Sequence, residues 1–319
     1  MSVNTCAFVG TNPKDEPITS GVPVTRQQTK IRCWEHGDTV RFRAAMNLEA
    51  HQRAVVSDYR EFPVPTHLAD YFLCFWTQAF VGVGEYAHRV LPDACVDIVF
   101  INDDPLVVVG PWTDPFVARF AAGTKIVGVR LHPGHAPRVL GMPATELLNR
   151  SAPLSDVWRI NRARFAPVLD KARFASRRSA LVEALLRVTA LAAPPDRVVL
   201  AGIRWLACHP HGRVEQLSRW IGISDRQLHR RFSAAVGYGP KIFQSVLRFQ
   251  RLLNIASRPR AQQSLADLAA VAGYADQAHM AREVRRFSNC TPTILLRSAE
   301  CTLRMSDLFK TDHLVPNYL

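Results

Sequence analysis

Two stretches of this sequence place arginine, glutamine and histidine side chains at helical spacing, opposite a row of apolar residues. In the first stretch, Leu228 and Phe232 share one face of a predicted helix, so Arg226 and Arg230 point away from that face. Arginine can donate two hydrogen bonds to guanine, glutamine can pair similarly with adenine, and an alanine methyl can contact the thymine methyl. The spacing therefore offers chemistry suited to base edges in a DNA major groove.

The second stretch repeats the arrangement, with Met280 and Val284 on the apolar face and Arg282 on the opposite one. A single arginine of this kind is more often part of a solvated helix surface, but two matching stretches favour a nucleic-acid interface. Because the second stretch carries alanines among its outer residues, phosphate contacts and groove shape would contribute more there. The candidate DNA-binding residues are Arg226, Gln227, His229, Arg230, Gln277, Ala278, Ala281, Arg282 and Arg285.

Each stretch is the second half of a repeated unit of two short helices joined at a glycine. The first unit covers 214–232 with Gly222 at its corner, and the second covers 265–284 with Gly273 at its corner. Glycine can adopt the positive φ that a tight corner between two helices requires. This pattern predicts a helix-turn-helix that is used twice.

Capping residues indicate where the helices of these units begin. Ser224 and Asp276 precede the two outward-facing helices, and their side-chain oxygens can accept hydrogen bonds from first-turn amides. Ser264 and Asp267 have the spacing of a capping box before the second unit. Between the units, a proline suited to a first helical turn predicts a long helix over Pro240–Ser257.

The positive charge of the chain is concentrated around these units. The net charge is +13, and residues 197–298 contain 16 Lys and Arg against 5 Asp and Glu. The other 217 residues contain 24 against 22. A basic module beside a nearly neutral one is the charge distribution expected of a nucleic-acid binder with a separate second domain.

The region upstream of the repeated units predicts a β-rich module with some helices. Short apolar runs separated by turn residues at a spacing of roughly ten residues are typical of a sandwich or barrel. The predicted strands cover 95–101, 106–110, 116–121 and 124–131. Helical patterns follow over 136–140, 144–149 and 178–193, and Pro194-Pro195 then marks a domain boundary.

The sequence therefore predicts an α+β chain with two domains. A barrel-like or sandwich-like module with flanking helices, for sensing or dimerisation, occupies residues 58–194. An all-α DNA-binding domain, with two helix-turn-helix units joined by a long helix, occupies residues 195–298. Residues 1–57 and the tail 299–319 show no clear pattern. No apolar run reaches the about 18 residues that a membrane span needs. The seven scattered cysteines are typical of reduced thiols, so we expect a cytoplasmic protein.

Signals for catalysis, a cofactor or a metal are weak. The seven cysteines are scattered without a CxxC pair, and phosphate-loop and hydrolase motifs do not occur. We therefore predict no catalytic residue, no cofactor and no metal. His132 and His135, together with His88, leave a metal sensor open as an alternative, although a solvated turn is the more common explanation for such a pair.

A small group of charged residues is expected inside the β-rich module. Asp93 and Asp97 alternate along a predicted strand and could face one cavity together with Arg130. We interpret the three as a structural polar cluster rather than as an anchor for an effector.

The stretch from about residue 198 to 297 resembles the DNA-binding domain of AraC/XylS-type regulators, most specifically over 273–287 and Thr291-Pro292. The resemblance implies two recognition helices that enter successive major grooves on one face of DNA. It also implies base contacts at Arg226, His229, Arg230, Gln277, Ala278, Ala281 and Arg282. Arg231 occupies a position that is usually apolar in that family.

Four stretches of the β-rich module, 70–76, 88–100, 109–111 and 127–131, resemble the uncharacterised N-terminal domain of one subgroup of these regulators. The combined resemblance implies a sequence-specific transcription regulator with double-stranded DNA and RNA polymerase as partners. It leaves open a small-molecule effector and a homodimer, and implies no membrane partner. The alternative is an enzyme or metal sensor in the β-rich domain with a regulatory DNA-binding domain.

Overall fold

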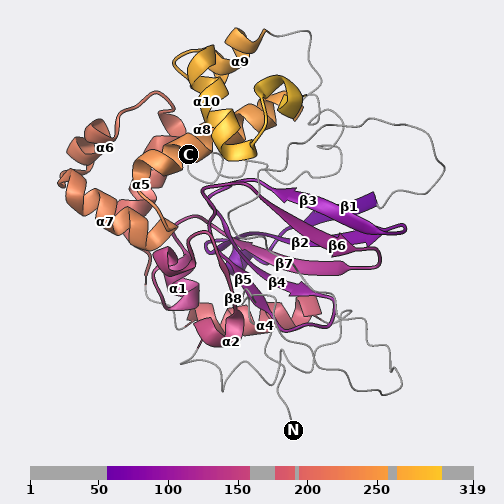
Figure 1. Ribbon diagram of the computed structural model, residues 1–319. Helices are drawn as coiled ribbons and strands as arrows, with labels where there is room; N and C mark the ends of the chain where they lie inside the picture. The colour runs from indigo at the N-terminus through magenta and orange to yellow at the C-terminus, as the bar shows by residue number, and fades with distance from the viewer. Residues whose placement is uncertain (1–55, 159–176, 191–193, 258–263, 297–319) are drawn as a thin grey trace, which may run out of the picture.

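The computed structural model contains a β-rich domain followed by a helical domain (Figure 1). The described residues are 56–158, 177–190, 194–257 and 264–296. The tail 299–319 lies outside these ranges, and so does segment 1–57 apart from Val56 and Ser57. Those two residues belong to the first strand.

The β-rich domain is built from two antiparallel sheets. The larger sheet has the order β1-β2-β7-β4-β5-β8, and the smaller one pairs β3 with β6. The strands are β1 (Val56–Phe62), β2 (Phe72–Val81), β3 (Glu85–Val90), β4 (Val96–Ile101), β5 (Val107–Val109), β6 (Phe116–Ala121), β7 (Lys125–Leu131) and β8 (Ser151–Pro153). Strands β4 to β7 confirm the four predicted strands. Strands β1 to β3 were not predicted individually; β2 is largely buried on both faces and lacks a clean alternation.

Helices cover one face of the larger sheet, and Figure 1 shows two of them, α2 and α4, below it. They are η1 (Thr66–Leu68), α1 (Ala136–Leu140), η2 (Ala144–Leu147), α2 (Leu154–Val157) and α4 (Arg177–Ala190). Ile98 and Val129 of the sheet share one core with Leu181 and Leu185 of α4, and all four are fully buried. The helix predicted over 144–149 is a short 3₁₀ turn.

The other face of the larger sheet packs against the smaller sheet. Trp76 and Phe80 of β2 share a core with Phe120 of β6, and the rings of Phe80 and Phe120 stack 4.6 Å apart. Gly128 leaves room for this packing, because a Cβ atom there would lie 2.3 Å from the Trp76 ring. This arrangement confirms the predicted sandwich-like module with flanking helices.

The helical domain contains the two predicted units and the long helix between them. Its helices are α5 (Arg197–Cys208), α6 (Val214–Ile221), α7 (Asp225–Val236), α8 (Pro240–Ser257), α9 (Leu265–Ala272) and α10 (Gln277–Ser288). Phe232, Phe249 and Phe287 come from α7, α8 and α10 and lie fully buried in one shared core. In the described ranges, no helix is both long and apolar enough to cross a membrane.

Candidate nucleic-acid interface

Helix α7 is fixed at its start by local chemistry that the sequence predicted. Gly222 ends α6 with φ of 80°, and the Ser224 hydroxyl then accepts a hydrogen bond from the Gln227 amide. Leu228 and Phe232 are fully buried, and the Phe232 ring meets Phe243 of α8 edge-on at 5.3 Å. These contacts set the rotation of α7 about its own axis and so decide which side chains face outward.

The candidate side chains of α7 lie on its exposed side. Arg226, Gln227, His229 and Arg230 are all exposed. Gln227 also closes the capping box, since its side-chain oxygen accepts from the Ser224 amide at 3.3 Å. His229 lies against the backbone of Gly239, where a Cβ atom would come within 2.5 Å of its Nε2. Arg226 and Arg230 therefore extend most freely toward a ligand.

Arg231, the residue that departs from the family pattern, has a structural contact. Its guanidinium donates to both carboxylate oxygens of Asp196, at 2.7 and 2.8 Å. Asp196 also caps α5 through the amides of Val198 and Val199. Burial opposes ionisation of Asp196, but hydrogen bonds from Arg231 and these amides outweigh it, so its pKa lies below the usual value. Arg231 thus ties α7 to the start of α5.

Helix α10 begins in the same way in the second unit. Gly273 ends α9 with φ of 94°, and the Asp276 carboxylate accepts from the His279 amide at 2.6 Å. Met280 and Val284 are fully buried. Four of the candidate side chains on α10 are exposed, namely Gln277, Ala278, Arg282 and Arg285. The fifth, Ala281, is half-buried. The predicted outer face of α10 is therefore presented to solvent, with Ala281 at its edge.

A second ion pair ties α10 to the connecting helix α8. Glu283 accepts hydrogen bonds from Arg248 at 2.9 Å and from the Ser245 hydroxyl at 2.6 Å, and His279 Nε2 lies 3.4 Å away. The side chains of Arg248 and Glu283 are 11% and 14% exposed. Helices α7 and α10 are therefore each anchored by an arginine–carboxylate pair, with the arginine on α7 itself in the first pair and on α8 in the second.

The end of α5 and the loop after it contact both the connecting helix α8 and the second unit. Gln244 of α8 donates to the Gly212 carbonyl at 2.6 Å, and Arg251 donates to the Ala207 carbonyl at 2.8 Å. Pro210 packs against the turn of the second unit, since a Cβ atom on Gly273 would lie 2.6 Å from it. The loop after α5 therefore contacts the corner of the second helix-turn-helix.

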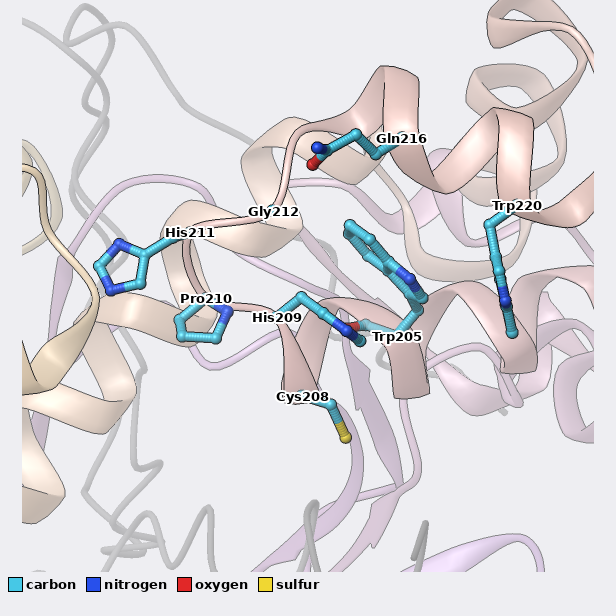
Figure 2. Close-up of a pocket in the computed structure, with 8 residues that line it drawn as sticks. All are labelled: Trp205, Cys208, His209, Pro210, His211, Gly212, Gln216 and Trp220. Atoms are coloured by element: carbon cyan, nitrogen blue, oxygen red, sulfur yellow. The ribbon is translucent and has the colours of Figure 1, made fainter.

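A cleft with a volume of about 610 Å³ lies beside the same loop (Figure 2). Trp205 stacks on His209 at 4.3 Å, and Trp220 of α6 is 62% exposed. Figure 2 shows Trp205 between His209 and Trp220. None of the candidate DNA-binding residues lines this cleft.

The charged group in the β-rich domain is brought together by strand register. Asp97 lies opposite Arg130 across β4 and β7, and the guanidinium donates to both of its carboxylate oxygens, at 3.1 and 3.0 Å. Asp93 lies 3.7 Å from the same guanidinium. Burial raises the pKa of Asp93 to about 6, although Arg130 acts to lower it. Asp93 precedes β4, so its predicted place on the strand is wrong: Ala94, with φ of 66°, turns the chain between them.

The histidines considered as metal ligands have other surroundings. His132 and His135 are buried, and Gly134 between them contacts Ile203 of α5, so their turn is not a solvated loop. The two rings lie 5.7 Å apart, whereas His88 contacts Phe80 and Phe120 between the sheets. Within the described part of the chain, no three His, Cys, Asp or Glu side chains are grouped to hold a metal ion.

Comparisons with known proteins match both domains. A model described as a helix-turn-helix domain matches residues 217–298, and one described as a domain of unknown function (DUF6597) matches residues 60–153. No curated protein matches the chain. Among solved structures, ToxT from Vibrio cholerae O395 is 8% identical with a TM-score of 0.38, and the alignment covers 77% of this chain and 98% of that chain.

Another ToxT structure, from Vibrio cholerae strain SCE256 with a bound unsaturated fatty acid, is 9% identical with a TM-score of 0.35. That alignment covers 78% of this chain and 97% of that chain. With identities and TM-scores this low, the fatty acid bound to that ToxT structure is not assigned to the present chain. The two domain matches agree with the geometry, and the chain joins a DUF6597 domain to a helix-turn-helix DNA-binding domain of the AraC type.

Proposed function

We propose that this protein is a sequence-specific transcription regulator that places α7 and α10 in successive major grooves of double-stranded DNA. The observation that carries the proposal is the pair of capped helices, each with a buried apolar face and an exposed row of arginine and glutamine. Residues 195–298 form the DNA-binding domain in this proposal, and residues 58–194 sense an effector or mediate dimerisation. RNA polymerase is the partner expected of a regulator, and the cytoplasm its expected location.

The two helices contribute differently in this proposal. Arg226 and Arg230, with Gln227 and His229, recognise bases, because an arginine fork fits the two acceptors of guanine. Gln277 adds a base contact from α10, where Ala278 and Ala281 offer only methyl groups. Arg282 and Arg285 then hold the phosphates and set the register of the protein on the duplex.

The test begins with a duplex selected in vitro by the full chain from random DNA. We expect Arg230→Ala to weaken binding to that duplex by about 1–3 kcal/mol and to relax preference at one base position. Binding measured against a panel of single-base changes gives both quantities. Arg187→Ala, an exposed arginine of α4, is the matched control. Unchanged discrimination in the Arg230 variant would contradict the role given to α7.

A further inference from the structure

The β-rich domain contacts both recognition helices at their C-terminal ends. Gly237, which ends α7 with φ of 101°, lies against Pro111, and a Cβ atom at this glycine would be 2.5 Å from the proline ring. At the end of α10, Arg89 of β3 donates to the Ser288 carbonyl at 3.4 Å, and its guanidinium lies 2.7 Å from the Cys290 sulfur. A cation at this end of a helix also complements the helix dipole.

The same domain contacts the helix that joins the two units. Gln250 of α8 is 1% exposed and donates to the Pro92 carbonyl at 2.5 Å. Ala94, two residues further along the loop between β3 and β4, is 2% exposed and belongs to the core of the helical domain. This loop therefore packs into the buried core of the helical domain beside α8.

These contacts leave the candidate DNA-binding side chains uncovered. Arg226 and Arg230 near the start of α7, and Gln277 and Arg282 in the first half of α10, remain exposed. The β-rich domain thus holds one end of each recognition helix while the other end faces outward. One body that contacts both helices and α8 restricts how far the helices can move relative to each other.

We propose that Arg89, Pro92 and Pro111 form a brace that sets the distance and angle between α7 and α10. In this proposal α7 contacts one half-site of the DNA and α10 contacts the other. The brace makes the protein selective for the number of base pairs between these two half-sites. One additional base pair moves a half-site by about 3.4 Å along the duplex and also rotates it about the duplex axis. A pair of helices held by the brace therefore binds the lengthened duplex with lower affinity. The inference rests on the proposed DNA-binding function and adds a specificity role for the β-rich domain.

The test measures the affinity of the full chain for the duplex selected by the wild-type protein, and for the same duplex with one base pair inserted between the half-sites. The spacing penalty is the ratio of the two dissociation constants. We expect Arg89→Ala and Gln250→Leu each to reduce this penalty by about fivefold or more, a usual size for coupling between sites. Arg119→Ala is the matched control, because Arg119 lies on β6 of the same small sheet and pairs with Glu85.

The spacing penalties of the variants distinguish the brace from the proposed function. A reduced penalty in the brace variants with an unchanged penalty in Arg119→Ala supports the brace. The same penalty in all the variants overturns the brace and leaves the proposed function standing. Failure of the wild-type chain to enrich any duplex overturns the proposed function, and the brace with it. Arg89 is exposed, so loss of folding does not confound that variant.

Discussion

The affinity of the full chain for its selected duplex should fall by about 10³-fold or more when monovalent salt is raised from about 50 to about 200 mM, if six to ten phosphates are contacted. The reason is the release of condensed counterions by basic side chains. Residues 197–298 carry 16 Lys and Arg against 5 Asp and Glu, and Arg282, Arg285 and Arg286 on α10 are all exposed. Fluorescence anisotropy titrations at several salt concentrations give the slope of log affinity against log salt.

A single substitution refines this prediction. Arg285→Ala should lower the magnitude of the slope by about one and weaken binding to all sequences similarly, as expected of a phosphate contact. Arg187→Ala on α4 should leave the slope unchanged, because that residue lies outside the helical domain. A flat salt dependence of the wild-type chain would exclude DNA as the partner of the basic surface.

The largest expected loss of stability comes from the buried cluster around Arg130. Asp97→Ala should lower the free energy of unfolding by about 3–5 kcal/mol, the usual cost of removing one partner of a buried ion pair. Arg130 is 6% exposed, so without Asp97 its guanidinium loses its two-oxygen acceptor while it stays away from water. Urea denaturation followed by circular dichroism measures the change.

Asp58→Ala serves as the comparison for this measurement. Asp58 pairs with Arg60 on β1, and the two side chains are 52% and 67% exposed. Solvent screens such a pair, so we expect a change of about 1 kcal/mol or less. Equal losses in the two variants would mean that the Arg130 cluster contributes no more to the fold than a surface pair.

The helix ends and outward faces of the helical domain were predictable from the sequence because they depend on local chemistry. Ser224 and Asp276 each cap a helix through an amide three residues away, and Gly222 and Gly273 supply the positive φ at the corners. These contacts span so few residues that their spacing is visible in the chain. The apolar rows of α7 and α10 then determine which residues face outward.

The β-rich domain was predictable only in part. Strands β4 to β7 are bounded by turn residues, whereas β2 is buried on both faces and changes register between Phe72 and Cys74. A bulge of this kind shifts which residues face each side, so simple alternation fails to mark the strand. The pairing of Asp97 with Arg130 was anticipated, but the place of Asp93 depended on the backbone turn at Ala94.

The sequence by itself determined the two helix-turn-helix units and the side chains that they present. Only the tertiary structure decided which arginines are engaged in the fold: Arg231 binds Asp196 and Arg248 binds Glu283, each across 35 residues. It also showed that the β-rich domain contacts the C-terminal ends of α7 and α10 through Pro111 and Arg89. Such contacts join residues far apart in the chain, and no local spacing signals them, because they form only when separately folded elements pack together.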